Sequence, residues 1–168
     1  DLFTGKPTRG ASTITMQVAR NFFLTREKTV TRKLREVLLA WKIEANLSKD
    51  EILQLYLNQI FLGQRAYGFA AAAQIYFGKP LSDVTPAEAA MLAGLPKAPS
   101  AYNPIVNPKR ATIRQQHIIE RMLDNGFITA EQAAAARAEK LRYRTQSELP
   151  VHAGYVAETA RQLVFAQY

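Results

Sequence analysis

The residue best suited to chemistry in this sequence is Glu36, a carboxylate surrounded by cations and apolar side chains. Arg32 precedes it by one helical turn and Lys33 by three residues, while Leu39 and Ile43 lie on the same side of the expected helix. Such surroundings commonly shift the pKa of a carboxyl group. The alternative interpretation is an ordinary, partly exposed Arg–Glu pair, which contributes roughly a few tenths of a kcal/mol.

Cations are concentrated in the same part of the chain. The sequence has 22 Lys and Arg against 14 Asp and Glu, a net charge of +8, and residues 1–42 hold nine of the cations and three of the acids. This excess predicts an anionic partner such as a phosphate, a nucleic acid or an acidic membrane surface. A solvated helix face is the alternative. The cations of this basic block are Arg20, Arg26, Lys28, Arg32, Lys33 and Arg35.

Small polar side chains follow Gly10 at the expected start of a helix. They are Ser12, Thr13, Thr15 and Gln17. The first N–H groups of a helix, together with hydroxyl groups, can bind an anion. Ordinary N-capping of the helix by Ser12 or Thr13 is the simpler interpretation.

Other candidate chemistry is sparse. Tyr56 and Asn58 lie in an otherwise apolar helix, where a buried Asn needs hydrogen-bond partners, so we expect a structural role for them. The sequence has no Cys, which excludes disulfides, zinc–thiolate sites and thiol catalysis. Its two His, His117 and His152, are far apart, so we expect no multi-histidine metal site.

The elements that must position these residues are almost all helical. With 48% hydrophobic residues the 168-residue chain can bury a core, and the pattern predicts an all-α domain of six to eight short helices with an extension from about residue 141. Gly63 is expected to end the third helix, and four prolines predict a loop over 96–108. The predicted helices span residues 12–23, 30–47, 48–62, 68–77, 85–95, 107–125, 129–140 and 152–168.

The helix over 30–47 has the most pronounced apolar face. Its C-terminal half is apolar nearly all round, so we expect this part of the helix to be buried. Glu36 lies about 150° from the centre of the face, counting 100° per residue. The residues that share the face are Val30, Leu34, Val37, Leu38, Trp41 and Ala45.

Four segments between residues 10 and 125 also have distinctive sequences. They are Gly-Ala-Ser-Thr-Ile-Thr-Met-Gln over 10–17, Arg-Lys-Leu-Arg-Glu over 32–36, the run over 49–63 with its continuation over 71–79, and the run over 109–122. In this order and spacing they resemble the second to fifth motifs of the peptidoglycan glycosyltransferases, glycosyltransferase family 51. The arrangement is most similar to that in class A penicillin-binding proteins.

This resemblance implies a lysozyme-like, mostly helical fold and the polymerisation of lipid II into glycan strands. In that family one Glu acts as general base on the acceptor 4-hydroxyl, the hydroxyl oxygen attacks the anomeric carbon of the donor, and undecaprenyl pyrophosphate leaves. A second Glu and a set of cations stabilise the pyrophosphate, often together with a divalent metal such as Mg or Mn. The resemblance places this reaction at the extracytoplasmic face of the bacterial cytoplasmic membrane.

By position in the motifs, Glu36 corresponds to the second, catalytic Glu of the family. The resemblance implies that the donor pyrophosphate is held by Arg20, Lys28, Arg32 and Lys33. It implies that the substrate cleft is lined by Ser12, Thr13, Gln17 and Asn21. It implies a structural role in the fourth motif for Tyr56, Asn58 and Gly63.

The sequence departs from the family pattern in three ways. The first motif, Glu-Asp-x-x-Phe-x-x-His-x-Gly, does not occur, so we expect a fragment that lacks the general base and is inactive alone. Met16 stands where Gln is usual, and Gln54 stands where Glu is usual. We expect a partial glycosyltransferase domain over 1–140 and the start of a linker toward an absent transpeptidase domain over 141–168.

The expected partners are lipid II, the growing glycan chain, a membrane surface and moenomycin-like inhibitors, and not nucleic acid. The rival hypothesis is a basic helical module that binds nucleic acid or serves as a scaffold, which rests on the charge of +8. Against nucleic acid, the basic block lacks interleaved aromatic residues that could stack on bases.

Overall fold

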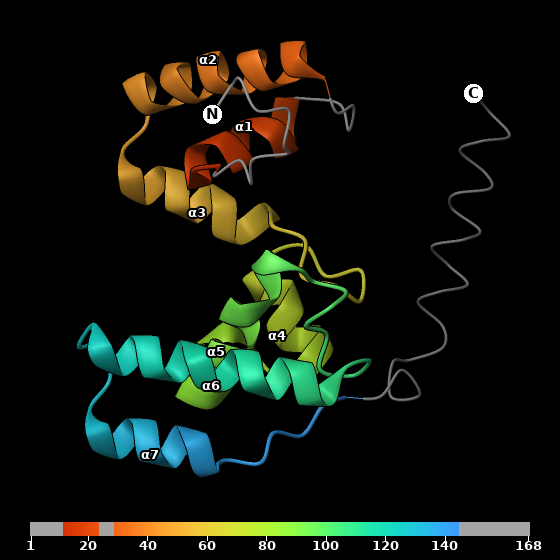
Figure 1. Cartoon of the computed structure of the whole chain (residues 1–168), viewed down its shortest axis with the longest axis vertical. Helices are drawn as coiled ribbons and strands as arrows, with labels where there is room; N and C mark the ends of the chain where they lie inside the picture. Colours follow the sequence, from red (N-terminus) through yellow and green to blue (C-terminus); the bar gives the residue numbers. More distant parts are fainter. Residues whose placement is uncertain (1–11, 24–28, 145–168) are drawn as a thin grey trace, which may run out of the picture.

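The computed structural model describes residues 12–23 and 29–144 of the chain, and these residues form an arrangement of helices (Figure 1). Within them the one β feature is an isolated bridge between Phe61 and Tyr67. The expected mostly helical class is confirmed. The helices are α1 (Ile14–Phe23), α2 (Val30–Asn46), α3 (Lys49–Gln59), α4 (Phe69–Phe77), the 3-10 helix η1 (Leu81–Asp83), α5 (Pro86–Gly94), the 3-10 helix η2 (Leu95–Lys97), α6 (Pro108–Asp124) and α7 (Ala130–Ala138).

The first three helices form one group, in which α1 packs against both α2 and α3 (Figure 1). The remaining helices form a second group around α5, which packs against α6 and α7. Two hydrophobic clusters fill the second group. One contains Ile60, Leu62, Ala66, Ala72, Ala73, Tyr76, Leu92 and Leu95. The other contains Ala87, Ala90, Ile119, Ala133 and Ala136.

Capping side chains begin several of these helices where the sequence predicts. Ser48 caps α3, Thr85 caps α5 and Thr129 caps α7, each in a capping box with the side chain three residues later. Each box satisfies free N–H groups of the first turn. The helix starts are therefore encoded locally, and the starts predicted at residues 48, 85 and 129 are confirmed.

The prediction for Gly63 is wrong. Helix α3 ends at Gln59, and Gly63 instead opens a tight turn in which its carbonyl accepts the N–H of Ala66 at 2.7 Å. Its φ of +84° favours glycine, and a Cβ at this position would lie 2.8 Å from the Tyr76 hydroxyl oxygen. Gly63 therefore permits a close approach between this turn and α4 rather than ending a helix.

The prediction that the C-terminal half of the helix over 30–47 is buried is also wrong, since Ala40 is the one buried residue in that half of α2, and most of the apolar face is exposed. Val30 is 88% exposed, Trp41 is 72% exposed, and Leu34 and Leu38 are exposed as well. The helix turns its other side, with Glu36 and Ala40, toward the inside. The physical reason is that Glu36 forms ion pairs and a hydrogen bond on that side, described below, and a charged cluster of this kind fixes the rotation of the helix.

The C-terminal end of the described chain packs back onto α4. The backbone N–H of Arg144 donates to the carbonyl of Tyr76 at 2.9 Å, and the Tyr143 ring lies 5.8 Å from that of Phe77. The helix expected over 152–168 and most of the expected linker lie outside the described residues. Among the described helices, none combines the length and the hydropathy needed to cross a bilayer.

Candidate functional site

Glu36 lies at the centre of a cluster of charged and hydroxyl groups between α1 and α2. Its side chain is 0% exposed. One oxygen, Oε2, accepts from Arg32 Nη1 at 2.6 Å, and the other, Oε1, accepts from Lys33 Nζ at 2.6 Å. Ser12 Oγ also donates to Oε1 at 3.3 Å and accepts from Lys33 Nζ at 2.9 Å. The predicted Arg–Lys–Glu grouping thus forms around a buried Glu36 with Arg32 and Lys33 partly exposed, and it is joined to α1 through Ser12.

These contacts determine the charge on Glu36. Burial raises the pKa of the carboxyl group, but the hydrogen bonds from Lys33 and Arg32 and the positive charges of Lys33 and Arg20 outweigh it. The net result is a pKa of Glu36 below its ordinary value. Glu36 is therefore ionised at neutral pH and fixes two cations, which is a different task from accepting or donating a proton.

Local sequence explains why these groups meet. The spacing of Arg32, Lys33 and Glu36 places all three within one turn of α2. Thr29 begins that helix by accepting from the backbone N–H of Arg32 at 3.1 Å. At the other end, Glu44 Oε1 accepts from Thr15 Oγ1 of α1 at 2.5 Å. Helix α2 is thus held against α1 at two places, and the cluster lies at one of them.

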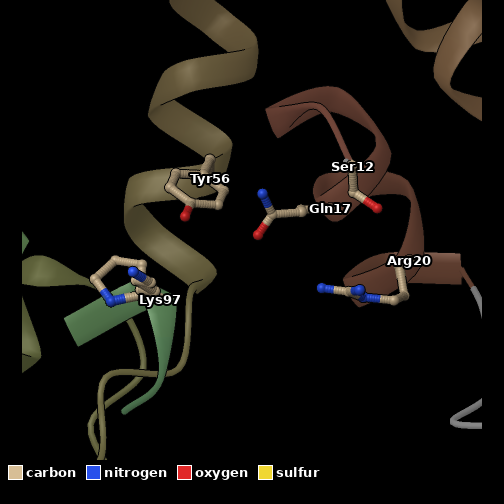
Figure 2. A pocket seen from close by; sticks show the side chains of 6 residues that line it. Ser12, Gln17, Arg20, Tyr56 and Lys97 are labelled. Atoms are coloured by element: carbon tan, nitrogen blue, oxygen red, sulfur yellow. The ribbon is translucent and has the colours of Figure 1, made fainter. Parts of the chain in front are cut away.

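A pocket of about 390 Å³ opens beside this cluster, between α1, α3 and η2. Figure 2 shows Ser12, Gln17 and Arg20 of the α1 segment on one side, with Tyr56 of α3 and Lys97 of η2 on the other. Ser12 belongs to both the cluster and the pocket. The pocket is lined by Ser12, Gln17, Arg20, Tyr56, Pro96 and Lys97.

The pocket wall is polar and positively charged. Arg20 and Lys97 provide two cations, and in the described residues no carboxylate lines the wall. Tyr56 is partly buried here; this desolvation raises the pKa of its hydroxyl group, and the charge of Arg20 offsets part of the effect. Such a wall fits a ligand with more than one negative charge.

Lys97 and Pro96 are pocket residues that sequence reasoning missed. They follow α5, about 80 residues after the α1 contacts, in the segment Leu-Pro-Lys-Ala-Pro over 95–99. The sequence does contain a signal that could have pointed to Lys97. It lies between two prolines, which restrict the backbone on either side of the cation. The loop itself is confirmed over 98–107.

Thr13 and Met16 have structural contacts at the start of α1. Thr13 Oγ1 accepts from the Met16 N–H at 3.1 Å, and the Thr13 N–H in turn points to Met16 Sδ at 3.5 Å. This is the reciprocal pattern of a capping box, with sulfur in the place where Glu or Gln usually stands. The capping interpretation therefore holds for Thr13, which is exposed and does not line the pocket.

Three other predicted residues do not line the pocket in the described part of the structure. Asn21 is exposed on α1, and Lys28 lies outside the described residues. Asn58 was expected to need buried partners, yet its side chain is exposed. The backbone of Asn58 instead packs closely against Gly68, because a Cβ at Gly68 would lie 2.5 Å from the Asn58 carbonyl oxygen.

Comparison with known proteins gives the family. The sequence profile described as "Transglycosylase" matches residues 1–123. The chain belongs to the transglycosylase family. The expected family resemblance is thereby confirmed, while the roles assigned to individual residues stay predictions.

Relatives and a solved structure agree with this transglycosylase assignment. The chain is similar to penicillin-binding protein 1A of Neisseria meningitidis (60% identity over 169 residues, 100% of this chain and 21% of the relative). It is similar to penicillin-binding protein 1A of Pseudomonas aeruginosa (53% identity, 99% of this chain and 20% of the relative). A crystal structure of penicillin-binding protein 1A from Haemophilus influenzae matches with a TM-score of 0.60 and 36% identity, over 94% of this chain and 20% of that one. This chain thus spans about a fifth of the length of these relatives.

Proposed function

We propose that the chain binds the lipid-linked donor of a peptidoglycan glycosyltransferase, which polymerises lipid II into glycan strands and releases undecaprenyl pyrophosphate. The observation that carries the proposal is the pocket with Arg20 and Lys97 in its wall, next to the ion-paired cluster of Arg32, Lys33 and the buried Glu36. Membership of the transglycosylase family supports the reaction class.

In this reaction the acceptor hydroxyl oxygen forms a bond to the anomeric carbon of the donor, and the bond from that carbon to the pyrophosphate oxygen breaks. Negative charge grows on the leaving pyrophosphate, and the hydroxyl proton passes to a base. Cations fixed in advance stabilise the growing charge without having to reorganise. Arg20 and Lys97 supply such cations in the pocket wall, and Glu36 orients Arg32 and Lys33 beside it.

A binding experiment on the chain tests this proposal. Inorganic pyrophosphate is titrated into the chain by calorimetry at two salt concentrations, because binding through two cations weakens as salt rises. Arg20→Ala is expected to weaken binding at least tenfold, since it removes a charge-assisted contact. Arg137→Ala, which removes an exposed cation on α7, is the matched control and is expected to leave the affinity unchanged. Equal affinities in the Arg20 and Arg137 variants would contradict the proposal.

We further propose lipid II, the growing glycan chain and moenomycin-like phosphoglycolipids as ligands of the same pocket. These ligands share a phosphate-linked sugar joined to a lipid, which matches a polar cavity with cations in its wall. Competition between lipid II and inorganic pyrophosphate for the chain tests this. Duplex and single-stranded DNA serve as further competitors, and displacement of pyrophosphate by DNA but not by lipid II would favour the nucleic-acid hypothesis.

We also propose that the site lies at the extracytoplasmic surface of the membrane. It is supported by the exposed apolar side chains of α2, which we call the α2 apolar face: Val30, Leu34, Leu38 and Trp41. Large exposed apolar surfaces mark interaction sites, and a lipid-linked substrate places this site next to a bilayer. The cations of the same helix, Arg32, Lys33 and Arg35, add attraction to anionic lipids.

For a divalent metal, the described residues do not form a cage. Among them no three His, Cys, Asp or Glu side chains gather, and both oxygens of Glu36 already accept hydrogen bonds from cations. Mg²⁺ is commonly held by one or two carboxylates together with substrate phosphates. We therefore propose that Mg or Mn, when present, is bound mainly by the pyrophosphate oxygens, and adding Mg²⁺ to the titration tests this as a change in affinity.

A further inference from the structure

One aromatic ring behind the pocket contacts two cations. The centre of the Tyr102 ring lies 6.0 Å from Lys97 Nζ and 6.0 Å from Arg114 Cζ. At this distance the negative face of an aromatic ring attracts a cation. Lys97 lines the pocket, whereas Tyr102 and Arg114 do not. The ring therefore connects a pocket cation to a second cation on α6.

The position of the ring does not depend on the pocket. Tyr102 packs against the core cluster around Leu62 and Tyr76, and its backbone N–H donates to the carbonyl of Ala98 at 3.0 Å. The next residue, Asn103, is buried, and its Oδ1 accepts from the Ile105 N–H at 2.9 Å. The loop after η2 thus holds Tyr102 through the core and the backbone.

Arg114 is the second cation at the Tyr102 ring. It packs beside Gly94, where an added Cβ would lie 2.9 Å from Arg114 Cγ. Its Nε is buried and has no hydrogen-bond partner within the described part of the chain. The guanidinium carbon lies over the ring of Tyr102 instead. The residue at position 94 must therefore be small for Arg114 to reach the ring.

Within the described part of the chain, Lys97 has no second anchor besides the ring. Across residues 12–23 and 29–144, it forms no ion pair, and the ring of Tyr102 is its one recorded side-chain interaction. A lysine side chain has four flexible bonds and loses much conformational entropy when it is fixed. A cation that the aromatic ring already restricts loses less entropy when it binds an anion.

We propose that Tyr102 is a positioning residue that holds the Lys97 ammonium at the pocket wall, across the cavity from Arg20, so that both cations bind one pyrophosphate. The inference rests on the proposed function, because it names the ligand group of the same pocket. Arg20 and Lys97 come from opposite sides of the cavity (Figure 2), which suits the two phosphoryl groups of a pyrophosphate. Arg114 keeps the ring in place.

The first test needs no ligand. In NMR spectra of the chain, the ε-methylene protons of Lys97 are expected to show an upfield ring-current shift from Tyr102. The shift is expected to persist in Tyr102→Phe, which keeps the ring, and to disappear in Tyr102→Leu. Unshifted Lys97 protons in the unchanged chain would overturn the inference, whatever the pocket binds.

The second test measures affinity for inorganic pyrophosphate. Tyr102→Leu is expected to weaken binding about two- to fivefold, the range for a cation–π contact of an exposed cation such as Lys97. Tyr102→Phe is expected to match the unchanged chain. Tyr143→Leu is the matched control, because Tyr143 is another partly buried tyrosine that stacks on Phe77 and does not line the pocket.

A double-mutant cycle separates positioning from a general effect on folding. Lys97→Ala is expected to weaken binding more than Tyr102→Leu, and the double variant is expected to bind like Lys97→Ala alone. Additive losses, or an equal loss in Tyr143→Leu, would overturn the inference. If the unchanged chain shows the ring-current shift but binds no pyrophosphate, the proposed function fails and the positioning role fails with it.

Discussion

At the scale of single residues, Glu36 shows how burial and charge act together. A carboxylate with 0% exposure is costly to bury alone, and here three donors satisfy it: Arg32, Lys33 and Ser12. Its lowered pKa shows that these contacts outweigh the effect of burial. We therefore interpret Glu36 as a residue that positions cations for an anionic ligand.

Replacing Glu36 by Gln is expected to destabilise the folded chain at pH 7 by about 1–3 kcal/mol. The amide has no charge to satisfy Arg32 and Lys33, and removing one partner of a buried ion pair leaves the other without compensation. The free energy of unfolding in urea measures the effect. Glu51→Gln, which changes an exposed carboxylate in the α3 capping box, is the control and is expected to cost less.

The Glu36→Gln variant also tests how the free energy of unfolding depends on pH. Because folding lowers the pKa of Glu36, its stabilising contribution is fully present above the unfolded pKa of Glu, about 4.3. The contribution is lost as the pH falls through the lower pKa of the folded state. The difference in unfolding free energy between the unchanged chain and Glu36→Gln is expected to shrink below pH of about 4. A difference that stays constant from pH 7 to pH 3 would contradict this assignment.

At the scale of elements, the connection from α3 to α4 depends on two glycines. Gly63 allows the turn to approach Tyr76, whose buried hydroxyl donates to the Leu62 carbonyl at 2.9 Å. Gly68 stands before α4 with φ +83° and ψ 157°, a region open essentially to glycine alone. These positions hold α3, and with it Tyr56, in a fixed relation to the second group of helices.

Gly68→Ala is expected to destabilise the chain at least twice as much as Gly126→Ala. Both glycines have positive φ, but a Cβ at Gly68 would lie 2.5 Å from the Asn58 carbonyl oxygen, whereas a Cβ at Gly126 meets nothing within 4 Å. Gly126→Ala therefore reports the cost of the left-handed backbone alone, about 1–2 kcal/mol. Thermal unfolding of both variants measures the difference, and equal midpoints would show that the contact with α3 carries no strain.

At the scale of the whole molecule, the two groups of helices differ in how they bury their apolar residues. The second group encloses both hydrophobic clusters, whereas in the first group the α2 apolar face points outward. The pocket lies where the two groups meet, with Arg20 from the first and Lys97 from the second. The proposed pyrophosphate ligand would therefore contact cations from both groups of helices.

Trp41 gives a direct test of the membrane proposal, because it is the only tryptophan in the sequence and is 72% exposed. Its fluorescence is expected to shift to shorter wavelength when vesicles of phosphatidylglycerol are added, since the ring enters a less polar environment. Leu34→Glu with Leu38→Glu is expected to reduce the shift by at least half without loss of helicity. The control is Ile113→Glu, which changes an exposed apolar residue on α6. An equal shift in the paired variant would argue against the α2 apolar face as the contact.

Much of the fold and part of the site were predictable from the sequence. Helix starts follow from capping residues within one turn, as at Ser48, Thr85 and Thr129, and the grouping of Arg32, Lys33 and Glu36 follows from their spacing. Lys97 could not be assigned to the pocket in this way. It lines the same cavity as Arg20 only because the tertiary fold brings η2, α1 and α3 around one pocket.

The amino-acid sequence by itself determined the helical class, the family and the cation-rich segment, because these depend on local spacing and on strings of residues. Tertiary structure decided which side of α2 is buried, the turn at Gly63 and the composition of the pocket wall. Periodicity reveals that a helix has an apolar side, but it does not reveal what covers that side. In α2 the ion pairs of Glu36 lie on the buried side, so the apolar face points outward.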